Sequence, residues 1–482
     1  MKFRVSETFA VPNLGGNGLR HVVDGTRALD TTYWDTADMR LARRGHTLRY
    51  RTSEDATNRW TMALGQRDAP SLLPRREIDG EGAPDIPPDA FVDALLGVTD
   101  GRALMAVARM RSEQHQASVE DAEGRRLLTI EDDRVAIVER NRTTGSFREV
   151  SVAVAHDSHG KRALRRAIRR LRDNGAGEPD SVPTLKRAVG SIAQRETAAL
   201  PGDATVEELV QFSVRDGLDQ LFAHDPAVRL DLGPEDIHQA RIATRRLRAN
   251  LRTLRPLLDR RTVDYLRHEI RWAGQLLGEV RDLDVLRASF TRSLEHAPIS
   301  RGSEVIDAVK AERAAAHCDL VAAMRSPRWQ TMLRLLDAAA VLPPLRATIA
   351  PTDDAGEAVP RLLRKSWRRL ERCVADAPVR PNGWHEVRKA AKSTRYAAEI
   401  LEPLLGGATH QLARDTERIQ TELGRTQDDA VARAWLDDHG RTGSLHSTTQ
   451  RMARHYDGPS GGKPRHWKKL WQSARRSAQA VA

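Results

Sequence analysis

Residues 238–255 read His-Gln-Ala-Arg-Ile-Ala-Thr-Arg-Arg-Leu-Arg-Ala-Asn-Leu-Arg-Thr-Leu-Arg, with six arginines and no acid. Successive residues of an α-helix are rotated by about 100°, so side chains at i, i+3 and i+4 share a face. The side chains predicted on one such face are His238, Arg241, Arg245, Arg248 and Arg252. The leucines and Ile242 lie toward another face. Because like charges along a helix repel each other, this face predicts a polyanionic ligand that neutralises it.

A second copy of this pattern begins at His385 at a constant offset (385 − 238 = 147). The equivalent basic residues of the copy are His385, Arg388, Lys392 and Arg395. Both segments also end alike, in Leu-Arg-Pro-Leu-Leu and Leu-Glu-Pro-Leu-Leu. Two copies without a third favour a pseudo-symmetric pair of helical bundles over a long solenoid.

The bulk composition agrees with a ligand of opposite charge. The chain has 482 residues, a formal net charge of +12 and 30% charged residues, which is ordinary globular composition. This length predicts at least two domains, and the charge points to nucleic acid, an anionic membrane surface or polyphosphate. The first residues lack the apolar core of a signal peptide, and no apolar run suits membrane insertion, so we expect a cytoplasmic protein. Two cysteines exclude a disulfide framework and argue against a thiolate zinc site.

The chain changes character near Leu200-Pro201-Gly202-Asp203, which predicts domains at 1–200 and 204–482. Short apolar runs separated by turn residues predict strands in the first domain, at Leu48–Arg51, Trp60–Leu64, Val107–Arg111, Leu127–Glu131 and Val150–Val154. Lys161–Arg172 is expected to be a strongly basic surface helix. From Thr205 onward the periodicity is helical, and the Pro-rich segment 343–360 separates the two repeats. Trp467 and Trp471 are expected to pack a terminal helix onto the bundle. The fold class expected is α+β.

The His-x-x-Arg-x-x-x-Arg-Arg-x-Arg helix, its second copy and the segment Leu277–Asp284 together resemble the CHAD domain, the conserved-histidine α-helical domain. The resemblance covers about residues 205–480. It implies an all-α domain of two repeated antiparallel helical bundles around a basic groove that binds inorganic polyphosphate. The ligand-facing residues it implies are His238, Arg241, Arg245, Arg248, Arg252, His385, Arg388, Lys392 and Arg395. For the two histidines, a hydrogen bond to phosphate and a structural role within the bundle are both open.

Residues Tyr33–Leu41, followed by Gly45–Arg51, resemble the CYTH domain of the triphosphate tunnel metalloenzymes. That family implies an antiparallel β-barrel whose lumen holds a triphosphate between basic residues and a divalent metal. Residues at i and i+2 of a strand share a face, so each of two arginine pairs can point into a lumen. The tunnel phosphate-binding residues expected on this basis are Arg49, Arg51, Arg109, Arg111 and Lys186. The arginines could instead lie on a polar outer face.

The acidic residues depart from the family pattern. The family begins with Glu-x-Glu-x-Lys, whereas this chain has Arg4, Ser6 and Thr8 at those positions. The carboxylates that could still bind Mg²⁺ or Mn²⁺ are Glu131, Asp133 and Glu149, and Glu149 is the one catalytic candidate. Because hydrolysis of a triphosphate needs a metal held by carboxylates, these losses predict a degenerate tunnel. Glu131 and Asp133 could also be solvated acids near a turn.

The sequence therefore predicts a polyphosphate-binding protein that requires no cofactor for binding and that could associate with polyphosphate granules. The first alternative is a triphosphatase or polyphosphate hydrolase of the tunnel domain that depends on Mg²⁺ or Mn²⁺. The second alternative is a nucleic-acid-binding protein, which the basic charge supports equally well. No base-reading motif accompanies that charge, and aromatic residues make up only 4% of the chain.

Overall fold

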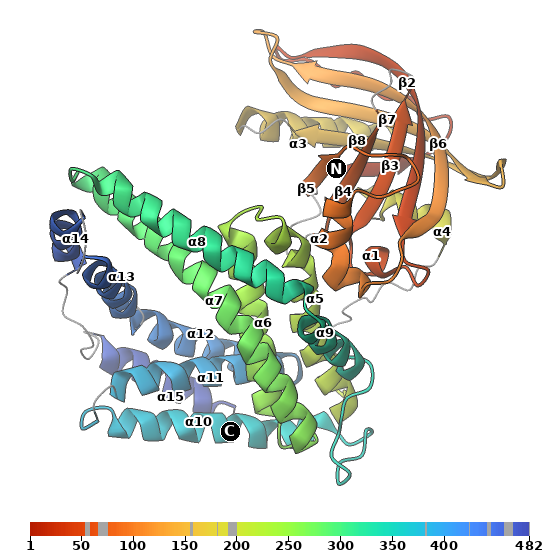
Figure 1. Ribbon diagram of the computed structural model, residues 1–482. Coiled ribbons are helices and arrows are strands. Elements are labelled where there is room, and N and C mark those ends of the chain that lie inside the picture. The colour runs from red at the N-terminus through yellow and green to blue at the C-terminus, as the bar shows by residue number, and fades with distance from the viewer. Residues whose placement is uncertain are drawn as a thin grey trace. The chain divides into compact units, whose positions relative to one another are not determined.

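The computed structural model describes the chain except for residues 54–57, 66–75, 155–157, 181, 191–199, 381–382, 424, 441–444, 457–465 and 482, and the side chains of 158–159 and 425–430. The chain forms two compact units, Met1–Glu196 and Thr197–Ala482 (Figure 1). Strands occur in the first unit, whereas the second is helical. The protein therefore has the α+β architecture that the sequence predicts. No helix in the described ranges is both long and apolar enough to cross a membrane.

The first unit is built on one antiparallel sheet. Its strands are β1 (Lys2–Val5), β2 (Arg20–Asp35), β3 (Thr47–Ser53), β4 (Arg59–Leu64), β5 (Arg76–Gly80), β6 (Met105–Glu120), β7 (Arg126–Glu139) and β8 (Arg142–Val154). They are hydrogen-bonded in the order β1-β8-β7-β6-β2-β3-β4-β5. All five predicted strands lie within these elements, so the alternation and turn residues locate them correctly.

The expected closed barrel is not formed, because the sheet is open in the described residues. A closed barrel needs a ladder between the two outer strands, β1 and β5, and no such pairing occurs among them. The physical reason is the difference in strand length. The outer strands have four and five residues, whereas the central strands β2 and β6 have 16 each. The long strands pair with one another, but only short strands stand at the two edges, and no pairing in the described residues joins those edges.

Helices cover parts of this sheet. They are α1 (Arg40–Arg43), α2 (Asp89–Thr99), α3 (Ser158–Asp173) and α4 (Thr184–Val189). The predicted basic helix is α3, and its buried side chains Ala163, Ala167 and Leu171 pack against Leu128 and Val150 of the sheet. The arginines of α3 point away from this contact and are mostly exposed. α3 thereby separates an apolar face from a charged one, as a surface helix does.

The second unit consists of helices. They are α5 (Val206–Arg229), α6 (Pro234–Leu254), α7 (Arg260–His296), α8 (Gly302–Arg325), α9 (Pro327–Ala339), α10 (Ala355–Asp376), α11 (Gly383–Leu405), α12 (Gly407–Glu422), α13 (Arg425–His439), α14 (His446–Ala453), η1 (Arg454–Tyr456) and α15 (Trp467–Gln479). A capping box begins α5, because Thr205 and Glu208 each bond the other's backbone N–H. The break between α9 and α10 falls in the predicted Pro-rich separator.

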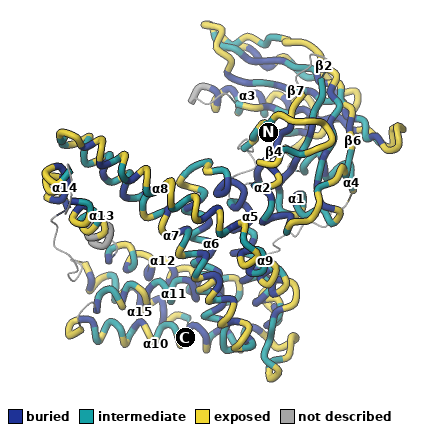
Figure 2. The backbone as a smooth tube through the Cα atoms, viewed as in Figure 1, coloured by how far each residue is buried: buried dark blue, intermediate teal, exposed yellow. Residues whose placement is uncertain are grey.

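The two repeats place their basic helices in equivalent positions and in contact. α6 packs between α5 and α7, α11 packs between α10 and α12, and α6 also packs against α11. Buried apolar residues such as Leu247 and Ala391 line the inner faces of these two helices. Figure 2 shows the contrast with outer helices such as α8, along which exposed positions dominate. Burial of the apolar faces is the main favourable term that holds the basic helices together.

The repeats are interleaved. Phe290 of α7 and Val305 of α8 form one core with Leu436 of α13 and Met452 of α14. Late helices of the second repeat therefore complete the core of the first. The terminal helix α15 stays with its own repeat, where Trp467 and Trp471 pack with Trp384 and Trp367. The predicted packing role of these two tryptophans is confirmed.

A glycine permits the close approach of α5 and α6. A Cβ added at Gly217 would lie 2.7 Å from Cγ of Leu247, whereas one added at Gly407 of α12 would meet nothing within 4 Å. We expect Gly217→Ala to lower the free energy of unfolding by about 1–3 kcal/mol, because overpacking forces the helices apart. Gly407→Ala should change it by less than about 0.5 kcal/mol. Chemical unfolding followed by circular dichroism measures both, and equal stabilities would refute the tight contact.

Candidate functional site

The two predicted basic helices bring their cations together in one place. The basic cluster, as we call it, consists of His238, Arg241, Arg245, Arg248 and Arg252 on α6 and Arg388, Lys392 and Arg395 on α11, with Arg267, Arg271 and Arg281 on α7 and Arg369 on α10. The positive charges of these residues lower the pKa values of their neighbours, which shows that the side chains lie close together. α6 and α11 position these side chains because each helix buries its opposite, apolar face.

Lys392 lies where the two stripes meet. Burial, followed by the positive charges of Arg245, Arg388, Arg395 and Arg241, lowers the pKa of Lys392 to about 6. Arg245 and Arg388 each have a buried guanidinium Nε without a hydrogen-bond partner among the described residues. Burial and neighbouring cations thus act together on Lys392, so the described part of this cluster carries a local excess of positive charge.

The structure adds members that the sequence prediction missed. Burial, then Arg271 and Arg267 of α7, lowers the pKa of Arg248. Burial, then Arg369 of α10, lowers the pKa of Arg252 to about 10. Arg267 and Arg271 are spaced i, i+4 on a helix, and this spacing was the signal that could have found them.

Three arginines of the basic cluster are bonded to acids, and the first is Arg267, which donates to Oδ1 of Asp264 at 3.1 Å. Arg241 donates to the backbone oxygen of Gly278 at 2.6 Å and to Oδ1 of Asp282 at 3.0 Å. Arg395 donates to Oε1 of Glu417 at 2.6 Å. These bonds fix the directions of the guanidinium groups, each of which has five N–H donors.

The two histidines differ in surroundings. Burial, followed by the charge of Arg281, lowers the pKa of His238, which lies beside the cluster arginines. The charge of His385 acts on its neighbour Glu386, whose pKa Lys389 lowers most. His238 is therefore part of the basic cluster, whereas His385 lies at its edge. A neutral His238 can still donate one hydrogen bond to a phosphate oxygen.

The sheet carries a second charged site on one face. Residues paired across an antiparallel ladder share a face, and the register pairs Arg51 with Thr31, Met110 with Thr31, and Met110 with Ile137. The charged face defined in this way carries Arg49, Arg51, Glu131, Asp133 and Glu149. Burial and Arg49 lower the pKa of Arg51, and the acids Asp133 and Glu131 oppose this shift. Arg49 and Arg51 thus lie on the same face of the sheet as the predicted acids, and Arg51 is close enough to Asp133 and Glu131 for their charges to interact.

The carboxylates of this face are not arranged as a metal site. Glu149, with 3% of its side chain exposed, accepts from Nζ of Lys2 at 2.6 Å and from Oγ1 of Thr184 at 2.8 Å. Asp133 Oδ1 accepts from Nε2 of Gln114 at 2.9 Å. Burial, then the charge of Glu131, raises the pKa of Asp133 to about 6. Within the described ranges, no three His, Cys, Asp or Glu side chains could hold a metal ion together. The ammonium of Lys2 already supplies the positive charge that Glu149 needs, so these residues do not fit a divalent metal.

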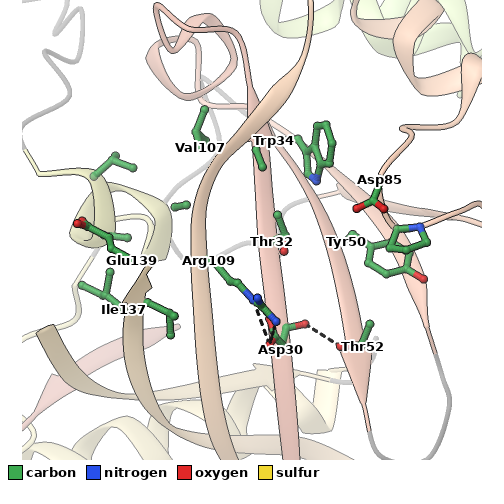
Figure 3. Close-up of a pocket in the computed structure, with 16 residues that line it drawn as sticks. Asp30, Thr32, Trp34, Tyr50, Thr52, Asp85, Val107, Arg109, Ile137 and Glu139 are labelled. Atoms are coloured by element: carbon green, nitrogen blue, oxygen red, sulfur yellow. Dashed lines mark hydrogen bonds and ion pairs between the residues drawn. The ribbon is translucent and has the colours of Figure 1, made fainter. Parts of the chain in front are cut away.

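Arg109 and Arg111 do not share the charged face, which corrects the expectation that they line the same lumen. Arg109 pairs with Thr32, and Arg111 with Asp30, so both point to the opposite side. Figure 3 shows Arg109 beside a cavity of about 830 Å³, where its Nε and a terminal nitrogen donate to Asp30. The sequence correctly predicts that Arg109 and Arg111 point to the same side of their strand. Which face of the sheet this is depends on the pairing register with the neighbouring strands, which the sequence does not show.

Lys186 lies on α4. The preceding residue, Leu185, packs against Tyr33 and Phe147 at the apolar end of the charged face. Lys186 has a polar or electrostatic partner of its own within the protein. α4 thereby brings this lysine to the correct side of the sheet, with its charge already engaged.

An antiparallel sheet with a charged face, followed by a duplicated helical unit with a basic cluster, defines the class of protein. Residues 1–185 match the model of the CYTH domain, and residues 213–437 match that of the CHAD domain. The chain therefore contains a CYTH domain followed by a CHAD domain. It is similar to uncharacterized proteins of Mycobacterium tuberculosis strains CDC 1551 and H37Rv, each 27% identical over 469 residues that make up 90% of this chain and 87% of the relative.

Solved structures resemble parts of the chain. The CHAD domain from the plant Ricinus communis is 23% identical with a TM-score of 0.49, covering 60% of this chain and 96% of that one. PptA from Streptomyces chartreusis is 18% identical with a TM-score of 0.41, covering 57% and 100%. A putative adenylyl cyclase from Hippeastrum with a dominant triphosphatase activity is 16% identical with a TM-score of 0.23, covering 36% and 88%.

The lowered pKa of Lys392 predicts a pH-dependent stability. Lysine in an unfolded chain titrates near 10.5, but Lys392 in the fold titrates at about 6. Between these values the unfolded state binds one more proton, so the free energy of unfolding rises with pH, and below about pH 6 the fold bears the full repulsion. We expect Lys392→Met to be more stable than wild type at pH 6 and to show a smaller rise in stability from about pH 6 to pH 8. Urea unfolding at a series of pH values measures this.

The matched control is Lys389→Met, on the same helix. Lys389 is exposed, and its Nζ donates to Oε1 of Glu386 at 2.9 Å, so it should keep the wild-type pH dependence. If Lys392→Met also keeps it, Lys392 is charged in the free protein and the cations are farther apart than the structure places them.

Proposed function

We propose that this protein binds inorganic polyphosphate through the basic cluster of its CHAD domain. The observation that carries the proposal is the half-buried Lys392, whose pKa is lowered to about 6, first by burial and then by the positive charges of Arg245 and Arg388 from the two repeats. Neutralising these charges with a bound anion removes the repulsion and restores the proton to Lys392. Folding brings the positive charges together at a cost in free energy. Because a bound anion removes this repulsion, the same free energy contributes to its binding affinity.

Phosphate suits the donors present. Guanidinium groups offer planar forks that match two phosphate oxygens, and each charge-assisted hydrogen bond contributes about 1.5–3 kcal/mol. The cluster extends from His238 past Lys392 to Arg252 and Arg369, so its charges follow a line and not a point. A linear polyanion with a charge at every phosphate engages such an array better than a single phosphate does, because several contacts form within one molecule.

Nucleic acid is the competing polyanion. It presents one charge per phosphate as well, but proteins that prefer it add aromatic platforms or base-reading side chains. Several tryptophans of the CHAD domain are packed within it: Trp384 with Trp467, Trp367 with Trp471, and Trp272 with Trp329. Because these rings are packed against other side chains, they do not form a platform for base stacking, which favours polyphosphate over nucleic acid as the ligand.

The CYTH domain is the second candidate site. Its Arg49 and Arg51 lie opposite three carboxylates on the charged face, and CYTH relatives include triphosphatases, which favours a phosphate ligand here too. The bond between Lys2 and Glu149 argues against metal-dependent hydrolysis. We therefore infer that this domain is catalytically degenerate and that any activity would need a divalent metal at Glu131, Asp133 and Glu149.

The basic cluster can be tested by removing unpaired cations. We expect Arg245→Ala/Arg388→Ala to weaken binding of long-chain polyphosphate by about 100-fold or more, because each guanidinium loses charge-assisted bonds worth roughly tenfold or more in affinity. Wild-type affinity should fall steeply between about 50 and 200 mM salt, and the double variant should show a shallower slope because it displaces fewer counterions. Titration calorimetry at both salt concentrations measures each quantity.

The control is Arg255→Ala, which removes one positive charge just beyond the end of α6 and is compared with the loss per charge in the double variant. Arg255 donates to Asp264 at 2.9 Å and is therefore already neutralised. It should bind polyphosphate within about twofold of wild type, because its charge is paired. Equal losses in both variants would mean that net charge alone governs binding. Displacement of polyphosphate by a single-stranded DNA at equal phosphate concentration would favour the nucleic-acid alternative.

Hydrolysis tests the CYTH domain. We expect wild-type protein with Mg²⁺ or Mn²⁺ to release phosphate from tripolyphosphate no faster than buffer does, because Glu149 is bonded to Lys2 and the remaining acids form no metal site. A colorimetric phosphate assay measures this. Release that is lost on Glu149→Gln and kept in Arg245→Ala/Arg388→Ala would instead establish a triphosphatase in the CYTH domain.

A further inference from the structure

A cavity in the CHAD domain has the opposite charge to the basic cluster. It has a volume of about 570 Å³ and is formed by α5, α6, α11 and the start of α12. Three carboxylates, Asp216, Glu399 and Glu402, line it with one guanidinium, Arg246. With three negative charges and one positive charge, the lining carries a net charge of −2 in a chain whose total is +12. A cavity of this sign is unsuited to phosphate.

Two buried acceptors in this lining have no donor. Asn250 is 2% exposed, and its Nδ2 donates to the backbone oxygen of Ser213 at 2.8 Å. The other polar atom of this side chain, Oδ1, has no hydrogen-bond partner among the described residues. Oε2 of Glu399 is likewise buried without a hydrogen-bond partner, with Arg246 3.7 Å away. Buried acceptors are rarely left without a donor, so the lining is complementary to a ligand that donates hydrogen bonds.

The remaining walls are apolar. Phe212, Ile400 and Pro403 line the same cavity. A metal ion prefers several oxygen ligands around it, and within the described ranges no three His, Cys, Asp or Glu side chains could hold one. A cation with a hydrocarbon body matches both parts of the lining, because its charged nitrogen donates to the acceptors and its methylene groups contact the apolar wall.

We propose that this cavity binds a small aliphatic amine, whose ammonium group donates to Glu399 and Asn250 and whose methylene chain lies along Phe212 and Ile400. Glu402 supplies a second anionic position at the mouth, where it is 40% exposed and accepts from His410. A diamine can therefore pair with both carboxylates, Glu399 and Glu402, whereas a monoamine can pair with only one of them. This site borders the basic cluster, because Glu399 also contacts Arg395 at 3.4 Å, but it uses the acids of α11 and not its cations.

The direct test is titration calorimetry of the full chain with 1,4-diaminobutane, at constant ionic strength and without phosphate. The uncharged 1,4-butanediol has the same carbon chain and should give no binding. We expect Glu399→Gln to weaken diaminobutane binding at least tenfold. The matched control is Glu417→Gln, because Glu417 and Glu399 both contact Arg395, at 2.6 and 3.4 Å, but Glu417 is not part of the cavity lining.

Binding kept in Glu417→Gln and lost in Glu399→Gln supports the site. The proposal is overturned if wild type does not bind diaminobutane, if the diol binds equally well, or if both variants lose binding alike. Glu402→Gln keeps the test decisive if Glu399→Gln fails to fold, because this partly exposed side chain should weaken diamine binding more than binding of butylamine. Polyphosphate titration of the same variants keeps the outcome distinct from the proposed main function.

Discussion

The repulsion between cations on α6 and α11 is the constraint around which the CHAD domain is built. Lys392 is surrounded by the guanidinium groups of Arg245 and Arg388, and these charges oppose folding in the absence of a ligand. Apolar contacts on the other sides of the same helices, through residues such as Leu247 and Ala391, overcome this repulsion. The domain thus keeps a local electrostatic cost, which loss of the proton from Lys392 reduces and which a bound anion would reduce further.

The CYTH domain shows the opposite arrangement. Its charged face contains arginines and acids together, and Lys2 neutralises Glu149 directly. Such a face needs no ligand to be electrostatically balanced. An incoming triphosphate would have to separate some of these pairs before it gained its own contacts, so its net affinity would be reduced by their cost. The two domains thus differ in charge balance: the CHAD domain has a local excess of positive charge, whereas the charged face of the CYTH domain is largely neutralised.

The parts predicted well from sequence are those governed by local periodicity. The stripe from Arg241 to Arg252 follows from helix geometry alone, and its partner stripe follows from the duplication. What could not be predicted depends on contacts between distant segments. Arg109 was assigned to the wrong face because strand register is set by long-range pairing. Arg369 was missed because only the folded bundle brings α10 next to Arg252. The open sheet likewise follows from the lengths of strands far apart in the chain.

The duplication is not perfectly symmetric, and the difference gives the basic cluster a direction. At the repeat offset of 147, the position equivalent to Arg252 is Glu399 (252 + 147 = 399). Arg252 extends the cations of the first repeat toward Arg369, whereas Glu399 ends those of the second by binding Arg395 and Arg246. Under the proposed function, a polyanion at Lys392 would therefore be attracted along α6 and repelled by Glu399 at the end of the α11 stripe. Because the same carboxylate lines the acidic cavity, one substitution between the repeats both limits the path of an anion and creates the site proposed for a cation.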